Sequence, residues 1–169
     1  MARLNVMPET LEAEALWAFC LALYARSEVE SACLTLQDAH GFDVMIVLFC
    51  LYAGKSGRKI DSATLDEAIA VGRDWGREIV APLRLTRRKL RTPSKGVDPH
   101  DAYRLRTRIQ AIEQDAERIQ HEQLCKLLKP PGLPASRQAA RDNLLAYARK
   151  LNTAPPEAFE VLLNAAFPA

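Results

Sequence analysis

Apolar residues recur along this chain at steps of three and four, and its glycines and prolines fall between the segments that show this spacing. Residues three and four apart share one face of an α-helix, whereas the residues of a half-buried strand alternate at every second position. No segment of the chain has the alternation of a strand. The pattern predicts an all-α protein, built as a single bundle of six or seven helices with one long amphipathic helix.

Length and composition fit one domain. The chain has 169 residues, of which 49% are hydrophobic and 26% are charged, as in an ordinary soluble globular protein. We expect a single helical domain over residues 1–169. Its parts are a compact core over 11–91, a long helix over 98–128 and C-terminal helices over 136–167.

Capping residues and helix breakers suggest the helix boundaries. Thr10 is a favourable N-cap for the first helix, and Ser27 with Glu30 forms a capping box before the second, which Gly41 ends. Pro82 must interrupt or kink the fourth helix, because proline lacks a backbone N–H and clashes with the preceding turn. The expected helices span about residues 10–26, 29–39, 43–52, 61–91, 99–128, 136–151 and 155–166, and Asp98 is the expected cap of the fifth.

The third helix is apolar on nearly every side and should lie at the centre of the bundle. Leu48 and Phe49, together with Trp17 of the first helix, are expected to be largely buried. The cysteines show no CxxC spacing, and we expect free, buried thiols in a reducing compartment. They are Cys20, Cys33, Cys50 and Cys125.

The first ten residues lack the apolar stretch of a secretory signal. The longest apolar run, residues 44–53, is too short for the roughly 20 residues that a spanning helix needs. We therefore expect a cytoplasmic protein without a membrane partner.

The long helix carries a narrow apolar seam whose steps alternate between four and three. Such a heptad pattern is typical of an antiparallel neighbour within a bundle, and packing against a second copy of the chain is the alternative. The seam consists of Leu105, Ile109, Ile112, Ala116 and Ile119, so a homodimer would form through residues 105–119.

Three ordered blocks of the chain resemble an uncharacterised family of small proteobacterial proteins of unknown function. The blocks are LWAFCLALYAR (16–26), ACLTLQDAHGFDVMIVLFCLYAG (32–54) and WGREIVAPLRLTRRKLR (75–91), so the match covers about residues 11–91. The resemblance implies a bacterial, soluble, cytoplasmic protein and supplies no activity, cofactor or catalytic residue. In that family an Asn commonly follows the Asp-Val pair, whereas Met45 stands here.

Charge is distributed unevenly although the net charge is only +2. Residues 1–72 carry 5 Lys and Arg against 10 Asp and Glu, while residues 73–108 carry 11 against 4. The basic segment includes a stripe whose steps of 4, 7, 4 and 3 place the side chains on one helical face. Its members are Arg73, Arg77, Arg84, Arg88 and Arg91.

The second and third helices are joined by a turn that carries Asp38, His40 and Asp43. Carboxylates and imidazole can hold a metal or move a proton. The simpler interpretation, which we favour, is that Asp38 and His40 close one helix while Asp43 caps the next. A divalent metal site normally needs a third or fourth ligand at a characteristic spacing, and none is evident.

Guanidinium groups can fork onto phosphate or carboxylate oxygens. Three interpretations of the basic face stay open: ion pairs with acidic residues of the N-terminal third, a surface for an acidic protein or RNA, and a site for a small anion. The face comprises Arg77, Arg84, Arg87, Arg88 and Arg91.

The preferred hypothesis is a non-enzymatic helical protein that binds a macromolecular partner through the basic face around residues 77–91. We expect no catalytic residue, metal or cofactor. The alternative is an enzyme or carrier for an anionic, phosphate-bearing apolar molecule. In that alternative Asp38 and Asp43 would hold a Mg²⁺ ion and the arginines would hold the phosphates.

Overall fold

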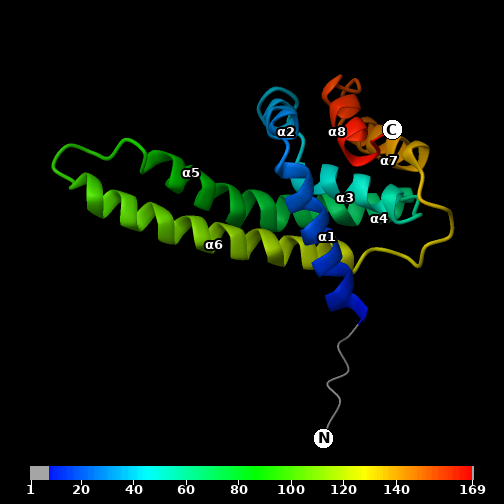
Figure 1. Cartoon of the computed structure of the whole chain (residues 1–169), viewed down its shortest axis with the longest axis horizontal. Helices are drawn as coiled ribbons and strands as arrows, with labels where there is room; N and C mark the ends of the chain where they lie inside the picture. Colours follow the sequence, from blue (N-terminus) through cyan, green and yellow to red (C-terminus); the bar gives the residue numbers. More distant parts are fainter. Residues whose placement is uncertain (1–7, 169) are drawn as a thin grey trace, which may run out of the picture.

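The computed structural model describes residues 8–168, which form helices joined by short loops and contain no strand (Figure 1). The order of elements is α1 (Pro8–Tyr24), α2 (Ser27–His40), α3 (Val44–Lys55), α4 (Ser62–Val71), the π-helical segment η1 (Gly72–Val80), α5 (Ala81–Lys89), α6 (Pro99–Cys125), α7 (Arg137–Lys150) and α8 (Ala158–Ala166). Because α4, η1 and α5 follow one another without a break, they form one long helix, and the described residues hold seven helices in all. The prediction of an all-α fold with six or seven helices is confirmed.

Helix α3 lies at the centre, as its apolar sequence predicts. Every residue from Val44 to Gly54 is buried, and Leu48 and Phe49 are fully so. Helix α7 packs along α3, while α1, α2, α6 and α8 cover it from other sides. The expected burial of Trp17 is only half right, since its side chain is partly exposed beside Arg118.

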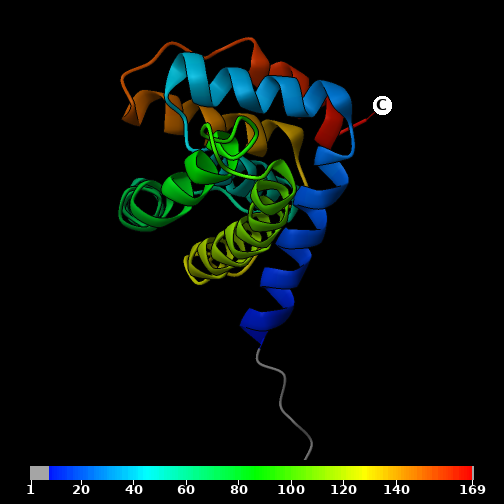
Figure 2. The same cartoon turned by 90° about the vertical axis from the view of Figure 1, so that its left-hand side faces the viewer.

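The hairpin of the long helix and α6 extends away from the rest of the molecule (Figure 1). We call α5, the connecting residues 90–98 and the N-terminal half of α6 the arm. Figure 2 looks towards the tip of the arm and shows α1 passing along one side of α6, with α2 lying above both. The arm and these two helices frame the space in which the candidate site lies.

Several predicted helix ends are confirmed. The side chains of Asp43, Asp61, Asp98 and Ser136 each accept a backbone N–H in the first turn of the following helix. Gly41 ends α2 in the left-handed conformation, with φ of 70°.

Two predicted N-caps are wrong. Helix α1 begins at Pro8, two residues before Thr10. Helix α2 begins at Ser27, so Arg26 takes the cap position and no side chain caps the helix. A capping box needs its serine outside the helix, and here the helix extends one residue further than the box allows.

The long helix passes Pro82 without interruption. The nine residues before Ala81 are π-helical, with wider turns than an α-helix. Proline removes one backbone donor and crowds the preceding turn. The expected disturbance therefore takes the form of a π-helical segment that ends just before the proline.

Helix α6 packs against the long helix through a face rotated away from the predicted seam. Ala116 of the seam is buried, but Leu105, Ile112 and Ile119 are 46%, 53% and 40% exposed. The buried face instead includes Ala102, Glu113, Ala116, Gln120 and Leu124. The prediction that the seam is the buried side of α6 is therefore wrong for three of its five residues.

The part of the cysteine prediction that concerns the fold is confirmed, since Cys20, Cys33, Cys50 and Cys125 are all free and buried. Among residues 8–168, no helix combines the length and the apolar character that crossing a membrane requires.

Candidate functional site

Two adjoining cavities lie where the arm meets α1, α2 and α3. The first, which we call the Asp43 pocket, has a volume of about 300 Å³. The second, which we call the groove, has a volume of about 640 Å³ and runs between α1, α2, α5 and α6. Gln37 and Arg84 line both cavities, and Arg84 Nη1 donates a hydrogen bond of 3.0 Å to Gln37 Oε1. This hydrogen bond marks the boundary between them.

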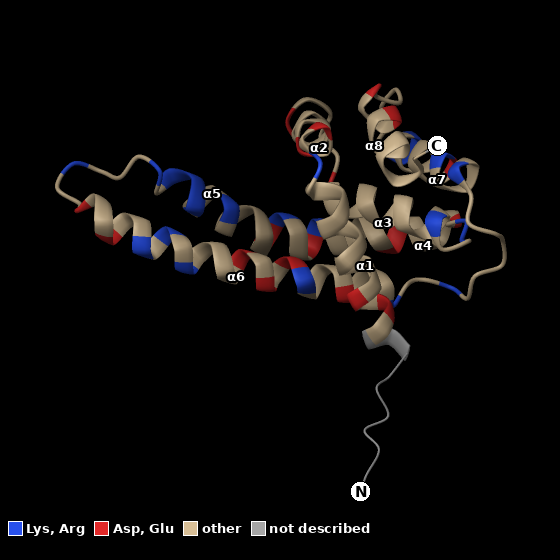
Figure 3. Ribbon diagram, in the orientation of Figure 1, with Lys and Arg blue, Asp and Glu red and all other residues tan. Residues whose placement is uncertain are grey.

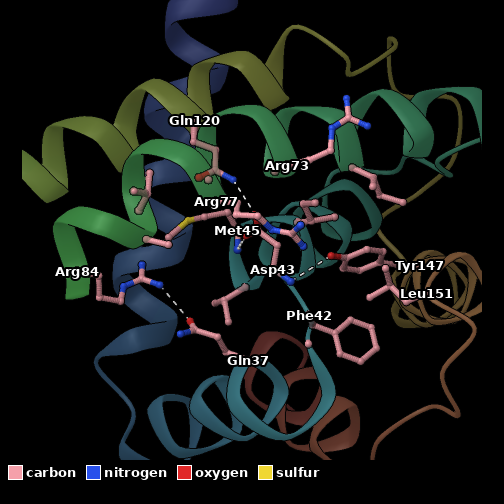
Figure 4. A pocket seen from close by; sticks show the side chains of 18 residues that line it. Gln37, Phe42, Asp43, Met45, Arg73, Arg77, Arg84, Gln120, Tyr147 and Leu151 are labelled. Atoms are coloured by element: carbon pink, nitrogen blue, oxygen red, sulfur yellow. Dashed lines mark hydrogen bonds between the residues drawn. The ribbon is translucent and has the colours of Figure 1, made fainter. Parts of the chain in front are cut away.

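Asp43 is held in place by three separate parts of the chain (Figure 4). Its Oδ1 accepts the N–H of Met45 at 2.8 Å, and its Oδ2 accepts Nε2 of Gln120 from α6 at 3.0 Å. Its own N–H donates to the hydroxyl of Tyr147 from α7 at 3.1 Å. Burial raises the pKa of Asp43, against the opposing effect of these hydrogen bonds. The carboxyl group is thus positioned tightly at the floor of the pocket.

The π-helical segment lies directly against the carboxyl group of Asp43. A Cβ atom at Gly72 would lie 2.7 Å from Asp43 Oδ2, and one at Gly76 would lie 2.8 Å from the same oxygen. Glycine is therefore required at both positions for this close approach. Since single π-helical turns occur frequently at functional sites, this contact singles out the Asp43 pocket.

Arginines of the long helix form the other wall of the pocket. Arg73 is exposed and pairs with the neighbouring Asp74 at 2.7 Å. Arg77 is also exposed and has no ion-pair partner among the described residues. Figure 4 places both on the side of the pocket opposite Phe42. Arg77 is thus free to meet an anionic group that enters the pocket.

The groove combines exposed apolar side chains with a basic edge. Leu21 and Tyr24 of α1 and Leu34 of α2 are 55%, 38% and 43% exposed, and all three line it. Its basic edge comes from α5 and from the turn that follows α5. This edge consists of Arg84, Arg87, Arg88 and Arg91. Figure 3 shows this concentration of Lys and Arg along α5. An amphipathic surface of this kind suits a partner that is both apolar and acidic.

Two of these arginines are fixed by acidic residues of α6. Arg84 Nε lies 3.1 Å from Glu113 Oε1, and Arg84 Nη2 lies 2.7 Å from Glu117 Oε1. Arg87 Nε pairs with the other carboxylate oxygen of Glu113, Oε2. Burial alone would raise the pKa of Glu113, but the hydrogen bonds and charges of Arg87 and Arg84 outweigh burial and lower it. The expectation that the arginines pair with acids of the N-terminal third is wrong for these two, because their partners lie on α6.

The other arginines of the basic face have free guanidinium groups. Arg88 and Arg91 are exposed, like Arg77, and none of the three has an ion-pair partner in the part of the chain that the structure describes. The basic face therefore divides into an anchored pair, Arg84 and Arg87, and three exposed cations.

The acidic turn does not form one cluster. Asp38 is exposed and lines the groove, Asp43 lines the pocket, and His40 is exposed and lines neither cavity. Residues 8–168 contain no group of three or more His, Cys, Asp or Glu side chains that could hold a metal ion. Asp43 acts as the N-cap of α3, in agreement with the simpler interpretation of this turn.

The structure also brings together a Cys and a His that are 101 residues apart. Cys20 Sγ lies 3.7 Å from His121 Nε2, and both residues line the groove. Burial raises the pKa of Cys20 far above its ordinary value, and burial together with Arg118 lowers that of His121 to about 4. The pair is therefore a neutral thiol beside a neutral imidazole, which does not activate a nucleophile.

The comparisons with known proteins identify a family and nothing further. The family described as "Protein of unknown function (DUF2390)" matches residues 15–124, which include the C-terminal part of α1, the elements from α2 to α5 and nearly all of α6. No curated protein matches the chain, and no solved structure matches it. The matched region contains nearly all of the residues that line the two cavities.

Proposed function

The chain belongs to the DUF2390 family, whose function is unknown, and we propose that it is a non-enzymatic docking protein. It binds an acidic amphipathic helix of a partner protein in the groove. The observation that carries this proposal is that exposed Leu21, Tyr24 and Leu34 line the same groove as the exposed Arg88 and Arg91.

The apolar side chains supply the energetic reason for a partner. Complete burial of a leucine side chain contributes about 1.5–3 kcal/mol, and Leu21 is still 55% exposed. Covering it gains on the order of 1 kcal/mol, and Leu34 and Tyr24 add similar amounts. Amphipathic helices bind in this way, with apolar side chains at i, i+3 or i+4, and i+7 inserted into a groove.

The basic edge selects the charge of the partner. Residues 87–108 of the arm carry eight Lys and Arg against two Asp. Arg84 and Arg87 are already paired, which leaves Arg88 and Arg91 to meet carboxylates beside the apolar side chains of the partner. Such rim charges accelerate association and make it sensitive to salt.

A protein helix fits this surface better than RNA does. Non-specific recognition of single strands depends on flat aromatic side chains on which bases stack. The lining of the groove from α1 and α2 has the exposed side chains of Leu21, Leu34 and Tyr24 and the partly exposed Trp17, so its two aromatic rings lie among exposed aliphatic side chains. Aliphatic side chains of this kind receive the apolar side chains of a helix.

The proposal is tested with a library of random helical peptides displayed on phage. The library is selected against the wild-type protein and counter-selected against Leu34→Asp, which places a charge in the groove. We expect enriched peptides with apolar residues at helical spacing and Asp or Glu beside them. Binding of an enriched peptide should weaken about tenfold in Arg88→Glu and lose part of its salt dependence.

Lys126→Glu is the matched control, because Lys126 is exposed, lies outside the groove and undergoes the same change of charge. Its peptide affinity should equal that of the wild type. Enrichment of basic peptides, or equal binding to Leu34→Asp, would overturn the proposal. Retention of a mixed-sequence single-stranded RNA in a mobility shift, lost in Arg88→Glu, would replace a protein partner with a nucleic acid.

A second candidate function is a carrier or enzyme for an anionic apolar molecule. The Asp43 pocket favours it, because Arg77, which has no ion-pair partner among the described residues, and Tyr147 line a cavity of about 300 Å³ that adjoins the apolar groove. A Mg²⁺ ion bridging Asp38 and Asp43 has no support, since these carboxylates line different cavities. Calorimetry with a short-chain alkyl phosphate, with and without Mg²⁺, tests this candidate, and Arg77→Ala should abolish the heat of binding.

A further inference from the structure

A second surface lies on the face of α6 that points away from the groove. Leu105, Ile112 and Ile119 are spaced by seven residues, which keeps them on one face of the helix, and they are 46%, 53% and 40% exposed. The groove is lined from the opposite face of α6, which includes Gln110, Gln114 and Glu117. We call the three exposed side chains and the residues between them on that face the α6 stripe.

The apolar surface continues onto the long helix. Trp75 Nε1 donates a hydrogen bond of 2.8 Å to the carbonyl oxygen of Ala116, so the indole lies against α6 beside Ala116. Ile79 follows Trp75 by about one turn and is 39% exposed. Contiguous exposed apolar surface rimmed by charges is typical of a protein-protein contact.

Two charged residues of opposite sign interrupt the stripe, one on each side of Ile112. Arg108 lies between Leu105 and Ile112, and Asp115 lies between Ile112 and Ile119. Both are exposed, and neither has an ion-pair partner within residues 8–168. The stripe thus has an apolar residue seven positions before and seven positions after Ile112. It carries a positive charge on the N-terminal side of Ile112 and a negative charge on the C-terminal side.

The whole of α6 has the same polarity. Its residues 99–111 carry three Arg against one Asp, while residues 112–125 carry four acidic residues against one Arg. A second copy of α6 laid antiparallel on the first therefore sets a basic half against an acidic half. A parallel arrangement would instead set Arg108 against its own copy, which costs several kcal/mol of like-charge repulsion.

We propose that this protein forms a two-fold symmetric dimer in which the α6 stripes of two copies pack antiparallel. Ile112 lies on the symmetry axis, Leu105 of each copy meets Ile119 of the other, and Arg108 of each copy pairs with Asp115 of the other. Such an interface is isologous and closes on itself, so assembly stops at two copies. The groove of each copy stays open, so the dimer presents two grooves. Formation of the dimer does not depend on the proposed function.

Sedimentation velocity across concentrations from low micromolar to submillimolar tests the dimer. Ile112→Asp should weaken the dimer about 100-fold or more, because it places two like charges together on the axis. The single variants Arg108→Glu and Asp115→Arg should each weaken the dimer by about the same factor as Ile112→Asp does. The double variant, with Arg108→Glu and Asp115→Arg together, restores both ion pairs and should return the affinity to within about tenfold of the wild type.

Leu85→Asp is the matched control, because Leu85 is 54% exposed and lies on α5 outside the stripe. It should leave the dimer unchanged, and circular dichroism confirms that each variant is folded. A wild type that stays monomeric at submillimolar concentration would overturn the proposal. So would a double variant that dissociates as readily as the single ones, or a Leu85→Asp variant as dissociated as Ile112→Asp.

Discussion

Gly76 and Asp43 are in direct contact: a Cβ atom at Gly76 would lie 2.8 Å from the carboxyl oxygen Oδ2 of Asp43. The same oxygen accepts a hydrogen bond from Gln120, and the Gln120 amide nitrogen lies 3.0 Å from that Cβ position. The π-helical segment, the start of α3 and the middle of α6 thus meet at one carboxyl group. The width of the π-helical turns and the absence of a side chain both bring the long helix to this point.

Gly76→Ala should therefore destabilise the protein, although alanine normally stabilises a helix by about 1 kcal/mol relative to glycine. The added methyl group has to displace Asp43 or Gln120, and overpacking of this kind costs about 1–3 kcal/mol. Chemical denaturation measures the difference. Gly132→Ala is the control, since nothing lies within 4 Å of its Cβ position, and it should change stability little. Equal stability of the two variants would contradict the contact.

Glu113→Gln should be strongly destabilising because it leaves Arg84 and Arg87 without their shared carboxylate. The Glu113 side chain is only 5% exposed, but those of the arginines are 21% and 18% exposed, so water screens part of the loss. We expect a cost of about 3 kcal/mol in the free energy of unfolding. Glu122→Gln, an exposed position on the same helix, should stay within about 0.5 kcal/mol of the wild type.

The same ion pair predicts a pH dependence. The arginines lower the pKa of folded Glu113 below its ordinary value of 4.5, which the unfolded chain retains. The stability that the carboxylate contributes is therefore fully present above the ordinary value and is lost as the pH falls through the lowered value. The difference in unfolding free energy between wild type and Glu113→Gln should be constant near neutral pH and shrink below about pH 4. A difference that grows on acidification would contradict this sign.

The four thiols should react slowly in the folded protein. Burial raises the pKa of Cys33 to about 11 and that of Cys125 to about 12, and it raises the pKa of Cys20 and Cys50 further. Since the thiolate is the reactive form, labelling with a thiol reagent near neutral pH should be slow until the protein is denatured. Rapid labelling of several cysteines in the folded state, or bound zinc in an elemental assay, would refute this prediction.

Features that depend on neighbouring residues were predictable from the sequence. The caps Asp43, Asp98 and Ser136 follow from short-range hydrogen bonds, and the central place of α3 follows from its uniformly apolar composition. The same reasoning named Arg84, Arg87, Arg88 and Arg91, which all line the groove.

Features that depend on distant partners were not predictable. Glu113 is a charged residue of a kind usually found at the surface. It is buried because Arg84 and Arg87, more than twenty residues away in the sequence, pair with it. Ile112, the neighbouring residue of the heptad pattern, is exposed. Gln120 and Tyr147 complete the Asp43 pocket from other helices, and no local signal marks them. Only the spacing of Gly72 and Gly76, one helical turn apart, offers a hint of a close approach.

The last prediction separates the two kinds of arginine on the long helix. Arg84→Ala removes hydrogen bonds to Glu113, Glu117 and Gln37 and leaves the largely buried Glu117 without a cation, so it should cost about 3 kcal/mol of unfolding free energy. Arg88→Ala, one turn later on an exposed side chain without an ion pair among the described residues, should cost no more than about 0.5 kcal/mol. Thermal and denaturant unfolding of the two variants, under identical conditions, measure the difference. A large loss in Arg88→Ala would mean that this arginine stabilises the fold, and of the two exposed arginines on the groove's basic edge Arg91 alone would then be left to meet a partner.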